Sequence, residues 1–125
     1  MRDRPTAPDL LDTARSVLKE RLLPALPKDL TYDALMILNA MGIAQRQCAA
    51  GQAPEEAARE RLRTLYNDAS ETPLADLEHR LAADIRTGRF DPGADGASAV
   101  YAHLRASTCA KAAESAPKAL KGREP

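Results

Sequence analysis

Apolar residues recur at helical spacing along most of the chain, in segments separated by short polar or proline-containing stretches. The spacing places the apolar side chains of each segment on one face of an α-helix. It predicts helices over about residues 6–22, 29–50, 72–88 and 97–115, and a further helix that begins at Pro54. In the segment over residues 72–88 the large apolar residues form one narrow seam: Leu74, Leu77, Leu81 and Ile85.

Prolines and glycines mark the ends of these segments. Pro24 and Pro27 stop the first helix, Gly51 and Gly88 end later ones, and Pro117 ends the last. No segment alternates apolar and polar residues as a strand does. The prediction is an all-α protein, a small antiparallel bundle of four to five helices with a central apolar helix. We expect one domain over residues 1–116, followed by a polar, frayed tail at 117–125.

The second helix is apolar almost all the way round, except for one polar stripe. Tyr32, Asn39 and Arg46 are seven residues apart and fall on the same side. A helix of this kind is expected to be central, with Asn39 buried and hydrogen-bonded. One interpretation is that Asn39 fixes helix packing, with Gly42 allowing a close approach. The other is a polar cleft lined by Tyr32, Asn39 and Arg46 that binds a ligand.

The composition points to closely packed helices. Alanine accounts for 25 of the 125 residues, and there are one Phe and no Trp. A core of alanine and leucine suits helices better than sheets. The 18 basic and 18 acidic residues cancel, so the basic surplus that nucleic-acid binding requires is missing. We also predict a homodimer, because the alanine-rich last helix buries little area alone.

Cysteine and hydropathy patterns predict a cytoplasmic protein without a cofactor or metal. Cys48 and Cys109 are isolated and are interpreted as reduced, partly buried thiols. Their spacings do not provide a zinc ligand set. The sequence contains no run of 18 apolar residues, which is about the length needed to span a membrane. His79 and His103 are single histidines with no partner at a catalytic spacing.

The segment 85–93, "IRTGRFDPG", is the clearest loop with candidate chemistry. Arg86 and Arg89 flank a helix C-terminus, and Asp91 follows. One interpretation is helix capping, since arginines favour the negative end of the helix dipole. The other is a recognition loop for an acidic group, because arginine binds carboxylate or phosphate in a bidentate manner.

Three stretches resemble a bacterial family of small helical domains of unknown function. They read "RDRPTAPDLLDTARSVLKERLLPALP", "YDALMILNAMGIAQRQ" and "LAADIRTGRFD", and the similarity covers roughly residues 2–110. Asn39 and Arg46 match the family's second helix, and its IR-x-G-x-x-D segment matches Ile85, Arg86, Gly88 and Asp91. The ending "STCAKAAESAP" departs from the family's Asn-Pro motif. The resemblance implies a place beside, or fused to, aminoglycoside-phosphotransferase-like kinases and acyl-CoA dehydrogenases.

Two functional hypotheses follow. The first is a non-catalytic accessory or partner domain for an acyl-CoA dehydrogenase or an aminoglycoside-phosphotransferase-like protein. The alternative is a protein that binds an acyl or phosphorylated metabolite. Its ligand-binding residues would be Tyr32, Asn39, Arg46, Arg86, Arg89 and Asp91. An enzyme is the least favoured hypothesis, because the sequence contains no recognisable catalytic motif.

Overall fold

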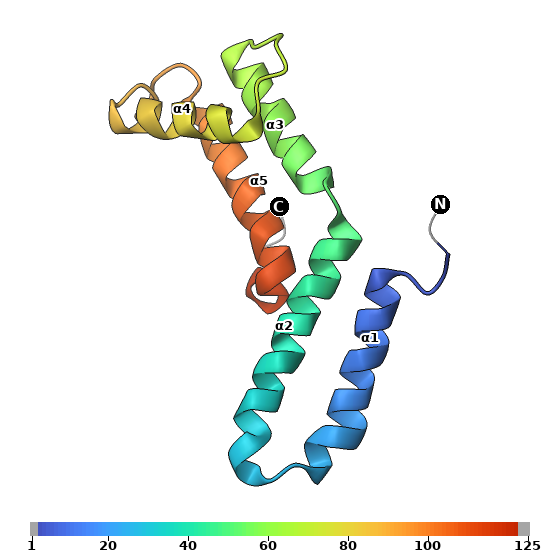
Figure 1. Ribbon diagram of the computed structural model, residues 1–125. Helices are drawn as coiled ribbons and strands as arrows, with labels where there is room; N and C mark the ends of the chain where they lie inside the picture. The colour runs from blue at the N-terminus through green and yellow to red at the C-terminus, as the bar shows by residue number, and fades with distance from the viewer. Residues whose placement is uncertain (1–2, 123–125) are drawn as a thin grey trace.

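A computed structural model describes residues 3–122 of the chain, and this part is all helical with no strand. Five α-helices follow one another, with short 3-10 and π-helical turns between or after them (Figure 1). They are α1 (Ala7–Val17), α2 (Thr31–Ala50), α3 (Ala53–Tyr66), α4 (Leu74–Arg86) and α5 (Ala97–Ser115). The all-α helical bundle predicted from the sequence is therefore confirmed.

Local chemistry explains where the first helix begins and how it is extended. The backbone N–H and the hydroxyl of Thr6 both donate to the carboxylate of Asp9, at 2.9 and 2.7 Å. This is one half of a capping box, which stabilises a helix N-terminus. These hydrogen bonds also hold the pKa of Asp9 below its usual value. A π-helical turn over Leu18–Leu22 extends the helix before the prolines of the connector stop it.

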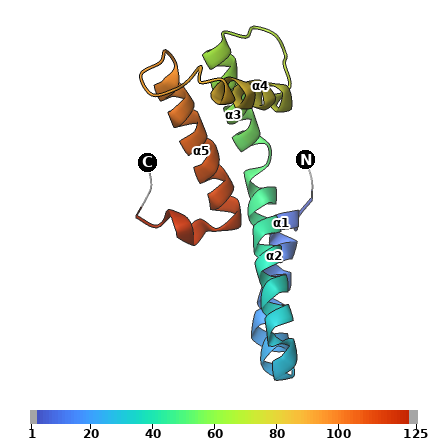
Figure 2. The same cartoon turned by 90° about the vertical axis from the view of Figure 1, so that its left-hand side faces the viewer.

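The helices form two parts that meet near the middle of the molecule. Helices α1 and α2 form a long antiparallel hairpin, while α3, α4 and α5 gather at the other end (Figures 1 and 2). A cluster of buried apolar residues lies in this second part and consists of Leu62, Leu77, Leu81 and Val100. Leu65, Tyr66, Leu74 and Phe90 pack against it while remaining partly exposed.

Helix α5 runs back from the three-helix end to α2 and joins the two parts. The Nε of Arg46 on α2 donates to the backbone carbonyl of Glu114 on α5, at 2.5 Å. Gly51 interrupts the path from α2 to α3 with a φ of 60°, a conformation that glycine adopts without strain. The same chain can therefore continue from the hairpin into the three-helix part with only two residues between the helices.

The start of α4 differs from the expectation, and the tail contains a short helix. Helix α4 begins at Leu74, two residues after the expected start at residue 72, and the Thr72 hydroxyl donates to Asp68 at 2.6 Å. Hydrogen bonds from Ser70 and from Thr72 lower the pKa of Asp68 to about 2. In the tail, Pro117–Leu120 forms a short 3-10 helix that contacts α5, and residues 123–125 lie outside the described part.

Candidate functional site

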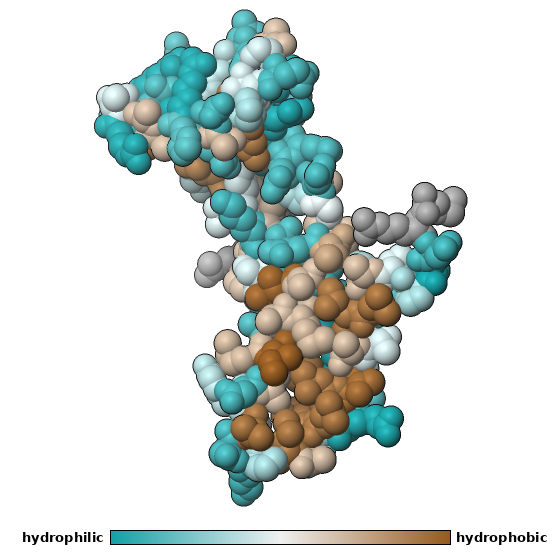
Figure 3. All heavy atoms as spheres, viewed as in Figure 1, coloured by the Kyte–Doolittle hydropathy of each residue, from teal (hydrophilic) through white to brown (hydrophobic). Residues whose placement is uncertain are grey.

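The most unusual feature of the molecule is a set of large apolar side chains exposed on the α1–α2 hairpin. We call this set the hairpin surface. Each member is between 41 and 70% exposed. In the space-filling view the hydrophobic residues gather over the hairpin, whereas the three-helix end is mostly hydrophilic (Figure 3). The set comprises Leu10, Val17, Leu22, Leu30, Tyr32, Leu35, Met36 and Ile37.

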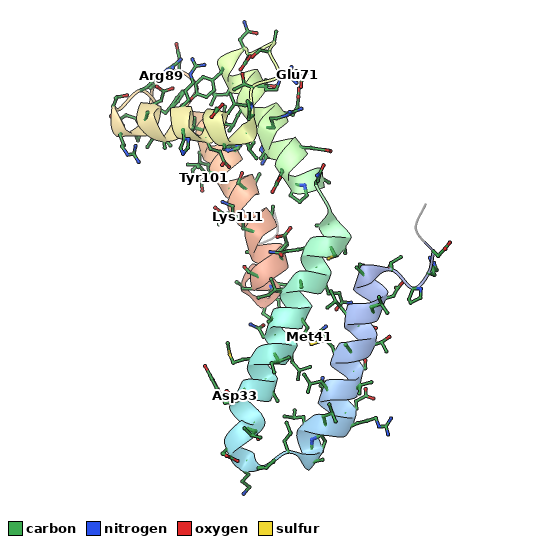
Figure 4. The ribbon with its side chains drawn as sticks, viewed as in Figure 1. Asp33, Met41, Glu71, Arg89, Tyr101 and Lys111 are labelled. Atoms are coloured by element: carbon green, nitrogen blue, oxygen red, sulfur yellow. The ribbon has the colours of Figure 1, made fainter. Side chains whose placement is uncertain are left out.

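The hairpin surface is open because α2 is covered on only part of its circumference. Ala34, Leu38 and Gly42 are its buried residues, and Met41 lies where α2 faces α1 (Figure 4). Relative to Leu38, Ile37 points about 100° to one side and Tyr32 about 120° to the other. Helix α5 meets α2 near Arg46, so the half of α2 that precedes Asn39 has both flanks open.

The expectation that Asn39 is buried and hydrogen-bonded is wrong. Asn39 is exposed, and its side chain makes no hydrogen bond to any other described residue. The reason is that α2 is apolar all round without being enclosed all round. Tyr32 is 70% exposed, and Arg46 lies two further turns beyond Asn39, about 20 Å from Tyr32 along the axis. The stripe therefore does not form one small cleft.

Arg46 instead meets an arginine of α1 at the buried Gly42. A Cβ placed on Gly42 would lie 3.3 Å from Cζ and from Nη2 of Arg15, and 3.3 Å from Nη1 of Arg46. The two guanidinium groups therefore lie close together. They occupy space that the side chain of any other residue type at position 42 would partly fill. Gln45 stands beside them, accepting from Nη1 of Arg15 at 3.1 Å and donating to Asp12 at 3.4 Å.

The loop after α4 uses its arginine within the chain. Nη1 of Arg89 lies 3.0 Å from the Asp84 carboxylate, and its guanidinium sits over the rings of Tyr66 and Phe90. Asp91 folds back on Gly88, with Oδ2 2.9 Å from where a Cβ would stand. These contacts favour the capping interpretation for Arg89 and Asp91. Arg86 is exposed.

Asp84 is also the partner of Tyr66, so one carboxylate serves two groups. The Tyr66 hydroxyl donates to Asp84 at 2.8 Å. Burial of the phenol and this hydrogen bond raise the pKa of Tyr66 to about 12. Arg80 lies 3.9 Å above the centre of the Tyr66 ring. The cluster ties α3 to α4 and to the loop, which is a structural role.

His103 on α5, a single histidine in the sequence analysis, is buried and hydrogen-bonded to an arginine. His103 is only 4% exposed, and its Nδ1 accepts a hydrogen bond from Nε of Arg61 at 3.2 Å. Arg61 also donates to Ser107, one turn further along α5. Burial, together with the nearby Arg61 charge, lowers the pKa of His103 below 6.5. The histidine is therefore held neutral, and the arginine links α3 to α5.

The structure does not bring the predicted site residues together. Tyr32 and Asn39 lie on α2, whereas Arg86 is the last residue of α4, and Arg89 and Asp91 follow in the next loop. Figure 4 shows Arg89 at the three-helix end of the molecule, away from the hairpin. Arg15 is the residue that sequence reasoning overlooked. Its position between Leu11 and Leu18, on the side of α1 that packs against α2, was the available signal.

Comparison with known proteins identifies the family to which the chain belongs. Within residues 3–122, no helix is long and apolar enough to cross a membrane. Neither the curated proteins nor the solved structures contain a match to this chain. A family model described as a domain of unknown function, DUF6285, matches residues 24–119, which include all of α2 to α5 but not α1. Because this match covers more than half of the sequence, the chain belongs to the DUF6285 family.

Proposed function

We propose that this domain is a non-catalytic interaction module that docks its hairpin surface onto a partner protein. The supporting observation is the exposure of eight large apolar side chains on one projecting hairpin. Together they expose on the order of 800 Å², which is what one partner contributes to a protein–protein interface of standard size. Contiguous apolar surfaces of several hundred Å² commonly mark interaction sites.

The charge of the hairpin favours an apolar contact over an electrostatic one. Residues 3–50 contain six acidic and six basic side chains, so this part of the chain has no net charge. Long-range attraction to a charged partner would need an excess of one sign. Because both flanks of the outer half of α2 are open, a partner that wraps the hairpin would cover more apolar area than a flat surface.

The resemblance described above suggests which partner to test. It implies genes for acyl-CoA dehydrogenases and aminoglycoside-phosphotransferase-like proteins beside those of similar domains. We therefore propose that the hairpin surface binds one of these two enzymes. In this role the domain would position or stabilise the enzyme and would contribute no catalytic group.

Co-purification with each enzyme, using two matched leucine variants, tests the proposal. Leu35 on α2 and Leu104 on α5 are 49 and 44% exposed, so neither substitution removes a core residue. We expect Leu35→Asp to abolish co-purification, because it places a charge in the contact, and Leu104→Asp to retain it. Equal retention by both variants, or no co-purification with either enzyme at micromolar concentration, would contradict the proposal.

Self-association is a second proposal, and a different surface supports it. Ile85, Tyr101 and Leu104 line one groove between the α4–α5 loop and α5, and they are 41, 67 and 44% exposed. A symmetric dimer would cover this patch with its own copy. We expect light scattering to show a dimer that Leu104→Asp dissociates and Leu35→Asp does not. A monomer at high concentration would exclude it.

A further inference from the structure

We propose that the junction formed by Arg15, Gly42 and Arg46 binds the phosphate group of a small metabolite. This inference does not depend on the docking of the hairpin. It differs from the polar stripe expected from the sequence, because it uses Arg15 in place of Tyr32 and Asn39.

The first argument is the convergence of two positive charges on one point. Cζ and Nη2 of Arg15 and Nη1 of Arg46 all lie 3.3 Å from the position where a Cβ of Gly42 would stand. Arginine remains protonated in proteins, so the two neighbouring guanidinium groups repel each other. Glycine at this buried position leaves room for both groups, since even a methyl group would crowd them.

The second argument comes from the hydrogen-bond partners of the two arginines. Nη1 of Arg15 donates to the amide oxygen of Gln45, and Nε of Arg46 donates to the backbone carbonyl of Glu114. Both acceptors are neutral. Neither arginine forms an ion pair with any residue between 3 and 122, where the three ion pairs present involve other arginines. The carboxylate of Asp12 is linked to Arg15 only through Gln45.

The third argument is a buried donor without an acceptor. Nε of Arg15 is the one buried side-chain polar atom in the described chain that lacks a hydrogen-bond partner. A buried N–H that bonds neither protein nor solvent is unfavourable, and native structures rarely contain one without a reason. An anion at the junction would neutralise the positive charge of the Arg15 guanidinium group, to which this N–H belongs.

The number of charges and donors indicates the class of ligand. Two guanidinium groups carry two positive charges and offer several N–H donors in planar forks. A phosphate monoester carries up to two negative charges and three acceptor oxygens, so one group can satisfy both arginines. A carboxylate offers one charge and two oxygens. The junction therefore matches a phosphate group better than a carboxylate.

The position of the junction gives binding a structural consequence. Arg15 comes from α1, Arg46 from α2, and the carbonyl that holds Arg46 from α5. A phosphate group between the arginines would tie the hairpin to the helix that connects it with the three-helix part. We expect a ligand that binds only the folded state to stabilise the protein by mass action.

Thermal shift and calorimetry with inorganic phosphate as the probe test the proposal. Potassium chloride of equal ionic strength controls for screening, and acetate controls for a carboxylate ligand. We expect phosphate to raise the melting temperature of the wild-type protein more than either control, and glycerol phosphate to act like inorganic phosphate. No phosphate-specific rise, or an equal rise with acetate, would overturn the assignment.

Variants identify the residues responsible. We expect Arg15→Gln and Arg46→Gln each to weaken phosphate affinity at least tenfold. The matched control is Arg86→Gln at an exposed arginine on α4, for which we expect less than a twofold change. Gly42→Ala retains both charges but crowds the guanidinium groups, so it should also weaken binding while leaving helicity by circular dichroism unchanged. Wild-type affinity in both Arg15→Gln and Arg46→Gln would refute the site.

Discussion

Leu35 and Leu38 lie three residues apart on α2, and truncating each to alanine should have very different effects. Leu38 is 9% exposed, whereas Leu35 is 49% exposed. Both substitutions change helix propensity equally, so the difference between them reports on burial alone. If α2 were enclosed on all sides, as its composition suggests, both truncations would lower the free energy of unfolding by the amount typical of a buried leucine.

The magnitudes follow from the exposed fractions. Replacing leucine by alanine removes three carbon atoms, worth about 0.8 kcal/mol each when fully buried. Nearly all of this transfer free energy is lost at Leu38, and the cavity left behind adds a further cost. The free energy of unfolding should therefore fall by about 2–4 kcal/mol. Roughly half applies to Leu35 and no closed cavity forms, so the expected loss is about 1 kcal/mol.

Urea denaturation followed by circular dichroism at 222 nm measures both variants against the wild-type protein. Low protein concentration should be used, and the midpoint checked at a second concentration, so that association does not contribute. We expect Leu38→Ala to lose at least 1 kcal/mol more stability than Leu35→Ala, allowing for the uncertainty of extrapolation. Losses that agree within about 0.5 kcal/mol would refute the claim that one face of α2 is open.

Two further outcomes concern the three-helix part. Tyr66→Phe removes the 2.8 Å hydrogen bond to Asp84, so the free energy of unfolding should fall by about 1–3 kcal/mol in urea titrations; an unchanged value would contradict the role of that bond. The pKa of His103 is lowered in the folded state, so the unfolded state takes up a proton first, and stability should decline as pH falls below 6.5. His103→Gln should remove this decline and His79→Gln should not, whereas an unaltered slope in His103→Gln would contradict the reasoning.

Helix positions were predictable from the sequence because their signals are local. Gly51 ends α2 and the residues after Gly96 begin α5 where the sequence indicated, since glycine, proline and the 3.6-residue period act within a few residues. Whether a neighbour covers an apolar face is not a local property. Asn39 was expected to be buried because an all-round apolar helix usually has neighbours on every side, and here α1 covers only one side of the half of α2 that precedes Asn39.

The candidate site was predictable only in part for the same reason. Arg46 was singled out for its place on a polar stripe, but its actual neighbours are Arg15 and Gly42. That contact depends on how α1 and α2 align across the hairpin, which no spacing within either helix reveals. Arg89 and Asp91 were located correctly on a loop at a helix end, and short-range contacts with Asp84 and Gly88 occupy them.

Site-specific photocrosslinking tests the docking of the hairpin surface most directly. Tyr32 and Tyr101 are 70 and 67% exposed, so replacing either with p-benzoylphenylalanine places the same reactive group at equal accessibility on different surfaces. With the acyl-CoA dehydrogenase or phosphotransferase-like enzyme present, we expect a crosslinked product that contains the enzyme from the Tyr32 position. From the Tyr101 position we expect no product that contains the enzyme, only a crosslink between two copies of this chain. An enzyme-containing product from the Tyr101 position alone, or from neither position with both enzymes, would contradict docking through the hairpin surface.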